Sequence, residues 1–72
     1  MIDIKRQLDN WFSYHKPDDV DITQYQAIRD AAKQFAQVLI ENTPPSADQS
    51  AAVRKLREAV MTANAAIACK GK

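Results

Sequence analysis

Apolar residues recur along the second half of the chain with the period of an α-helix. Between Ser46 and Lys70 they are spaced three and four residues apart, at Val53, Leu56, Val60, Ala63 and Ile67. Such spacing places one apolar seam along a helix. Ser46 stands at the N-cap position, with Gln49 three residues later, as in a capping box. The pattern predicts a helix over 46–70, about 35 Å long at 1.5 Å per residue.

A second apolar seam precedes the first, with spacings of four, three and four residues, at Ile28, Ala32, Phe35 and Leu39. We predict a helix that is capped by Thr23, has Gln26 in the capping-box position, and runs to about Asn42. Pro44 and Pro45 end it, because tandem prolines cannot continue a helix. Two helices joined by so tight a turn predict an antiparallel helical hairpin.

The N-terminal segment 2–12 carries a shorter helical pattern, with one apolar face made by Ile4, Leu8, Trp11 and Phe12. A helix this short does not stand alone in water, so we expect it to dock through its aromatic end. We interpret residues 12–23 as a structured loop, because Pro17 disfavours helix at the residue before it. Side-chain hydrogen bonds that compete with helix are expected there from Asp18, Asp19 and Asp21.

The fold class follows from these elements. No segment shows the alternation of a strand, and 72 residues suffice for one domain over 1–72. We therefore predict an all-α fold, a short N-terminal helix followed by a two-helix hairpin. Several apolar residues fall off the hairpin seams, namely Val38, Ile40, Met61 and Ala65. A patch of this kind usually marks a partner surface, so we expect a homo-oligomer.

Charge and cysteine content exclude several classes. The net charge is +1, from ten basic and nine acidic residues, which does not fit a dedicated DNA- or RNA-binding module. Cys69 is alone, so it forms no intrachain disulfide, and with the single His15 it makes no metal site. No segment is apolar enough to span a membrane. Acids and bases mix at the N-terminus, unlike a signal peptide, so we expect an intracellular location and no cofactor.

One cluster has the chemistry of a nucleotide site. Tyr14, His15 and Lys16 precede a helix on which Arg29 and Lys33 share a face, and Tyr25 lies one turn before Arg29. Aromatic stacking combined with cations is how proteins hold nucleobases and phosphates. The same residues also fit a solvated helix face beside a capping loop, which is the commoner outcome on physical grounds alone.

Two further polar residues have structural interpretations. His15 acts as a general base only with an orienting partner and a substrate in reach, so a hydrogen bond to the loop backbone is the simpler role. Asn64 interrupts the apolar seam of the last helix, where an amide must be satisfied. We favour a structural, register-setting role for Asn64 over contact with a ligand.

Three segments together resemble a known family: FSYHKP at 12–17, YQAIRDAAKQFAQVL at 25–39, and PPSADQSAAVRKLREAVMTANAAIA at 44–68. In order and spacing they are similar to the phage anti-CBASS cyclic-oligonucleotide sponges, whose helical hairpin is shared with Thoeris anti-defence sponges. The resemblance implies a protein of the infected host's cytoplasm that sequesters cyclic dinucleotides, such as 3′,3′-cyclic GMP-AMP, and cyclic trinucleotides without cleaving them. It also implies a compact homohexamer, with dinucleotides between paired protomers and trinucleotides where three protomers meet.

The resemblance also implies site residues. Tyr14 matches the base-stacking aromatic, His15 and Pro17 match loop-shaping residues, and either Arg29 or Lys33 matches the main phosphate contact. Together with Tyr25 from the aromatic and basic cluster, the predicted ligand set is Tyr14, His15, Pro17, Tyr25, Arg29 and Lys33. A second site would use Asn64 and Lys70. Two residues depart from the family pattern: Cys69 stands where an Arg is usual, with Lys70 beside it as a substitute, and Thr62 replaces a Trp. If the usual Arg serves the site where three protomers meet, trinucleotide binding depends on whether Lys70 takes its place.

Four alternatives remain open at the level of sequence. The chain could be a helical adaptor that binds a host protein, a DNA-binding helical module, a hydrolase of cyclic nucleotides, or a sponge for signals of the cyclic ADP-ribose type. Near-neutral charge disfavours the DNA module. The chain offers no nucleophile in a catalytic context, which disfavours an enzyme.

Overall fold

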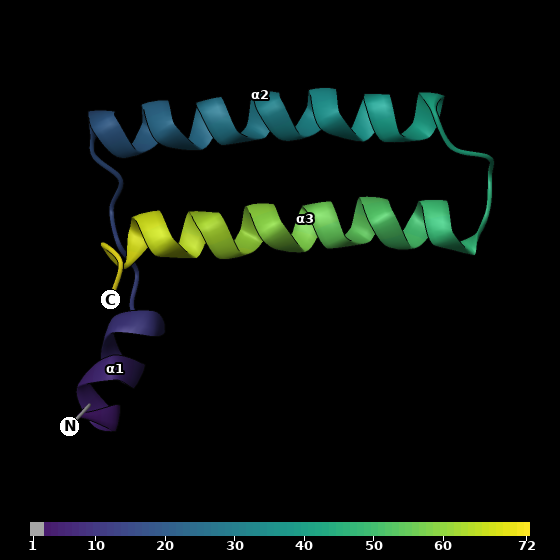
Figure 1. The fold of residues 1–72 in the computed structure, drawn as a ribbon. Helices are drawn as coiled ribbons and strands as arrows, with labels where there is room; N and C mark the ends of the chain where they lie inside the picture. The colour runs from purple at the N-terminus through teal and green to yellow at the C-terminus, as the bar shows by residue number, and fades with distance from the viewer. Residues whose placement is uncertain (1–2) are drawn as a thin grey trace.

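The computed structural model describes residues 3–72 and contains three helices over that range (Figure 1). They are α1 (Ile4–Trp11), α2 (Asp19–Glu41) and α3 (Ala47–Ala68). Helices α2 and α3 lie antiparallel and side by side, and α1 projects from the open end of this hairpin. Within residues 3–72 there is no strand, so the predicted all-α class and the hairpin are confirmed.

Helix α2 begins before the predicted N-cap. Its N-cap is Asp18, whose Oδ1 accepts the backbone N–H of Asp21 at 2.8 Å, while Asp21 Oδ2 accepts the N–H of Asp18 at 3.2 Å. The predicted cap Thr23 lies inside the helix and donates its hydroxyl to the carbonyl of Asp19. The predicted loop over 12–23 was therefore too long, because carboxylates in a first turn satisfy free N–H groups and complement the helix dipole.

The turn between α2 and α3 follows the sequence closely. Ser46 caps α3 as predicted and accepts the N–H of Gln49 at 3.1 Å. The Gln49 amide does not complete the predicted capping box. It reaches back across the turn and donates to the hydroxyl and carbonyl oxygens of Thr43, at 3.1 and 3.2 Å. This side chain ties the start of α3 to the residues that end α2.

Helix α3 ends at Ala68, two residues before the predicted boundary. The N–H of Gly71 donates to the Ala66 carbonyl at 2.9 Å, and the N–H of Lys70 to the Ile67 carbonyl at 3.2 Å. This pair of bonds is a Schellman motif. Lys70 occupies its left-handed position with φ 55°, which a glycine adopts more readily than any residue with a Cβ.

Helix α1 is shorter than predicted, and residue 2 lies outside the described range. Its apolar face docks only in part: Ile4, Leu8, Trp11 and Phe12 are all exposed, but Trp11 lines a cavity together with Thr62, Ala65 and Ala66 of α3. The Gln7 side-chain amide donates to the Lys72 carbonyl, which places α1 beside the end of α3. Within one chain, therefore, Trp11 lies against α3 as predicted, whereas Phe12 is 82% exposed and does not dock.

The hairpin has a seam but no closed core. All five predicted seam positions of α3 are half-buried against α2, whereas no hydrophobic residue among 3–72 is fully buried. The accessible surface is 6180 Å², against about 4,500 Å² expected for a compact monomer of this mass. The Cα radius of gyration is 15.6 Å, against about 11 Å for a compact chain of this length. A single chain thus leaves much of its apolar surface in water.

Candidate functional site

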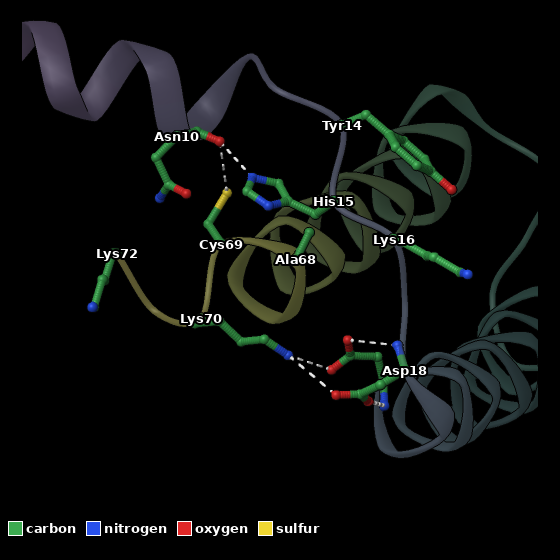
Figure 2. Close-up of a pocket in the computed structure, with 10 residues that line it drawn as sticks. Asn10, Tyr14, His15, Lys16, Asp18, Ala68, Cys69, Lys70 and Lys72 are labelled. Carbon is green, nitrogen blue, oxygen red and sulfur yellow. Dashed lines mark hydrogen bonds and ion pairs between the residues drawn. The ribbon is translucent and has the colours of Figure 1, made fainter.

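A polar cavity of about 470 Å³ lies at the open end of the hairpin (Figure 2). The loop over 12–18, the start of α2 and the end of α3 meet there. Its polar and titratable lining includes Tyr14, His15, Lys16, Asp21, Cys69 and Lys70. The tripeptide singled out by its chemistry in the sequence is thus placed on a cavity and not on a plain surface.

Local hydrogen bonds hold the loop that carries this tripeptide. His15 Nε2 lies 2.6 Å from the carbonyl oxygen of Asn10, and the Ser13 hydroxyl donates to the carbonyl of Asp9. A carbonyl can only accept, so Nε2 of His15 carries the hydrogen. The ring nitrogen that faces Asn10 is therefore a donor and not a base. This geometry agrees with the loop-shaping role predicted for His15.

Tyr14 presents its ring to solvent. The residue is 86% exposed, and in Figure 2 its ring points away from Asn10. A large aromatic side chain with so little protein contact contributes little to the fold of this chain. The neighbouring hydrogen bond of His15 fixes the backbone that carries it. Tyr14 is therefore available to stack on a planar partner.

The strongest electrostatic contact of the site joins the end of α3 to the start of α2, at the open end of the hairpin. Lys70 Nζ donates to Asp21 Oδ1 at 2.8 Å and lies 3.9 Å from Asp18 Oδ2 (Figure 2). Asp21 is the only buried residue of those described, with a side chain 8% exposed. Its hydrogen bond from Lys70 lowers the pKa of the Asp21 carboxyl below 3.8, and the same bond raises the pKa of the Lys70 ammonium above 10.5. Each charge stabilises the other.

The Lys70–Asp21 pair predicts a loss of stability at both pH extremes. The Asp21 contribution is complete above its unfolded pKa of 3.8 and is lost as the pH falls through the lowered folded value. The Lys70 contribution is complete below 10.5 and is lost as the pH rises through the raised folded value. We expect Asp21→Asn to flatten the acid limb of the free energy of unfolding, measured by urea denaturation between about pH 2 and about pH 5.

Asp48→Asn is the matched control for this measurement. Asp48 is also an acid in the first turn of a helix, but it lies at the other end of the hairpin and forms no ion pair within residues 3–72. Its variant should keep the acid limb of the parent. An equal flattening in both variants would show that the Lys70 contact is not the cause.

The structure leaves two predicted cations away from this cavity. Arg29 and Lys33 are exposed on α2 and are not part of the lining, and Arg29 donates to the Gln26 side chain at 3.3 Å. Tyr25 is half-buried and close enough to Lys70 for an electrostatic interaction. Pro17 is half-buried within the loop. Inside one chain, the predicted ligand set therefore divides between the loop and the face of α2.

The predicted second-site pair also divides. Lys70 lines the cavity, whereas Asn64 does not. The side-chain oxygen Oδ1 of Asn64 is buried and has no hydrogen-bond partner within the described residues. A buried amide oxygen without a donor is costly, so the predicted satisfaction of Asn64 is not achieved by the single chain.

Sequence reasoning missed the carboxylates of this site. Asp18 and Asp21 were expected to oppose helix formation, yet they cap α2 and bind Lys70. The signal was present, because two acids three residues apart before an apolar seam have the spacing of a capping box. The role of the Asn10 carbonyl had no sequence signal, since a main-chain acceptor is available at every residue.

Comparison with known proteins gives one match. The family model described as Acb2/Tad1, hairpin domain, matches residues 5–68. Neither the curated proteins nor the solved structures contain a significant match to the chain. Within residues 3–72 no three His, Cys, Asp or Glu side chains lie close enough to hold a metal ion. None of the helices described is long and apolar enough to cross a membrane.

Proposed function

This chain belongs to the Acb2/Tad1 hairpin-domain family, and we propose that it binds the cyclic di- and trinucleotide signals of bacterial CBASS immunity. The family consists of phage anti-defence proteins that sequester cyclic nucleotides and do not turn them over. By holding the signal in the cytoplasm of the infected host, the protein would keep the downstream effector silent. The preference for CBASS signals is the specific part of this proposal.

One observation carries the proposal: an exposed aromatic ring stands on a hydrogen-bonded loop beside a cavity that is lined by lysines and carboxylates. Tyr14 is 86% exposed, its neighbour His15 is bound to the Asn10 carbonyl, and Lys16 lines the same cavity. Stacking on aromatic rings is worth about 1–3 kcal/mol per base and needs no particular base. Lysines nearby suit the phosphates of a cyclic nucleotide. The sponge needs no catalytic group, and the ring nitrogen of His15 that faces Asn10 is already engaged.

Assembly into a homo-oligomer completes the proposal. The surface in excess of a compact monomer is about 1,700 Å², and a standard interface buries about 800 Å² on each partner. Each protomer therefore has enough surplus area for two interfaces, which supports a closed assembly such as a hexamer. In such an assembly Arg29 and Lys33 of one protomer could meet Tyr14 of another. The separation of these residues within one chain then has a simple explanation.

A sponge for signals of the cyclic ADP-ribose type is the second candidate. The family match covers the Tad1 branch as well as the Acb2 branch, and it does not separate their ligands. Both ligand types offer a purine to stack and a phosphate to pair. Tyr14 and the nearby cations fit either of them.

The test is calorimetric titration of the purified protein with 3′,3′-cyclic GMP-AMP, a cyclic trinucleotide and a cyclic ADP-ribose isomer in parallel. We expect tight binding of the cyclic dinucleotide, and its recovery intact after the complex is heated. Recovery of a linear product would replace the sponge by a hydrolase. Binding of the cyclic ADP-ribose isomer alone would move the protein to the Thoeris branch, and silence with all three would overturn the proposal.

A further inference from the structure

We propose that Lys70 is a positioning residue, whose ammonium group joins the end of α3 to the buried Asp21 carboxylate and so fixes the loop that presents Tyr14. The expected effect on ligand binding rests on the proposed function. The claim that Lys70 orders the loop concerns the free protein and does not depend on any ligand. Lys70 would act through the loop and would not contact the ligand.

The first support is the burial of Asp21. In a chain where no hydrophobic residue among 3–72 is fully buried, the one buried residue is this carboxylate. A carboxylate leaves water at a high cost unless it is paired and hydrogen-bonded. Here Asp21 receives the Lys70 ammonium at 2.8 Å and the Asp18 N–H at 3.2 Å. Removal of Lys70 would leave the Asp21 charge without its ion-pair partner at the point where the loop enters α2.

The second support is that few other contacts hold the loop against the hairpin. The loop's own hydrogen bonds tie it to α1. Helix α1 in turn reaches the end of α3 through the Gln7 amide on the Lys72 carbonyl and through the Cys69 thiol, 3.9 Å from the Asn10 carbonyl oxygen, and neither of these contacts reaches α2. The ion pair therefore connects the end of α3 to the junction of the loop with α2. The position of Tyr14 relative to the hairpin depends on that junction.

The third support is the backbone of Lys70 itself. Its φ of 55° is the conformation in which a Schellman motif favours glycine. A lysine is less stable in this backbone conformation than a glycine, so the ion pair of its side chain is the favourable contribution that we assign to this position. The helix dipoles favour the same contact, because a cation at the end of α3 meets an anion at the start of α2.

A direct role for Lys70 as a phosphate ligand is the alternative, and Asp21→Asn separates the two by the sign of its effect. The amide oxygen of Asn keeps an acceptor for the Asp18 N–H, while the charge that holds Lys70 is removed. If Lys70 positions the loop, Asp21→Asn weakens ligand binding although it makes the site more positive. If Lys70 binds phosphate directly, Asp21→Asn releases the ammonium group and strengthens binding of the anion.

The experiment compares Lys70→Gly, Lys70→Arg and Asp21→Asn with two charge-matched controls, Lys55→Gln and Asp48→Asn. Lys70→Gly keeps the backbone motif, because glycine adopts φ 55° without strain. The first readout is the ¹⁵N order parameters of the backbone amides of residues 13–16 in the free protein, which report the motion of a loop whether or not its amides are hydrogen-bonded. The second is the Kd for 3′,3′-cyclic GMP-AMP. Circular dichroism of each variant checks that the helices are intact.

We expect lower order parameters at 13–16 in Lys70→Gly and Asp21→Asn, with the middle of α2 and α3 unchanged. Both variants should bind about tenfold more weakly, as when the competent loop conformation falls to about a tenth of the population. Lys70→Arg and both controls should match the parent. Unchanged order parameters at 13–16, or tighter binding by Asp21→Asn, would overturn the positioning role. If the parent binds no cyclic nucleotide, the proposed function fails, and the order parameters alone decide whether Lys70 orders the loop.

Discussion

Tyr14→Ala is expected to weaken binding of 3′,3′-cyclic GMP-AMP by at least about 30-fold. Each stacked base is worth about 1–3 kcal/mol, and a dinucleotide held between two protomers would lose two Tyr14 rings. A total of about 2 kcal/mol or more corresponds to this factor at 1.4 kcal/mol per tenfold. Since the residue is 86% exposed, its removal should leave the free energy of unfolding almost unchanged. Calorimetry and urea denaturation on the same samples measure both quantities.

Tyr14→Phe is the matched variant for this experiment. It keeps the ring and removes only the hydroxyl, so stacking should survive and the Kd should stay within a few-fold of the parent. Lost affinity in both variants would assign the effect to the hydroxyl and not to stacking. Full affinity in Tyr14→Ala would mean that the ligand binds elsewhere, and the cavity at the open end of the hairpin would no longer be the candidate site.

Phe35→Glu is expected to break the proposed oligomer into smaller species. Phe35 is 54% exposed and lies on an almost wholly apolar groove of about 310 Å³ between α2 and α3. Full burial of an exposed Phe contributes about 1.5–3 kcal/mol, of which only the part that covers the remaining 54% comes from the interface. A carboxylate in its place must also lose its hydration without a partner. In a symmetric oligomer this loss of interface free energy occurs at every copy of the interface. Sedimentation velocity at micromolar concentration should show the fall in mass.

Two controls accompany Phe35→Glu. Phe35→Leu keeps an apolar residue and should keep the assembly. Lys55→Glu also introduces a carboxylate, but on a solvated part of α3, and should leave the mass of the assembly unchanged. Circular dichroism checks that the helices survive in each. If Phe35→Glu keeps the full mass, this groove does not face another protomer. If the parent itself is a monomer, the oligomer must be abandoned together with any site shared between protomers.

Much of the fold could be predicted because its signals are local. The seam spacing of α3, the cap at Ser46 and the tandem prolines each act within a few residues of the chain. The error at the start of α2 was also local: the acids at Asp18 and Asp21 were interpreted as breakers when their spacing is that of a cap. The aromatic of the candidate site was found for the same reason, since Tyr14 and His15 are adjacent in sequence.

The sequence alone determined that this protein is a helical hairpin with one aromatic and basic loop, because helix periodicity, capping and proline chemistry need no tertiary contact. Only the tertiary structure decided what surrounds that loop. Lys70 and Asp21 are 49 residues apart, and their contact exists because antiparallel packing brings the end of α3 to the start of α2. The same packing left Phe35 exposed and buried a carboxylate in place of a hydrophobic core. Two packed helices have too little surface to enclose a hydrophobic core, and which side chains they cover depends on how they pack against each other.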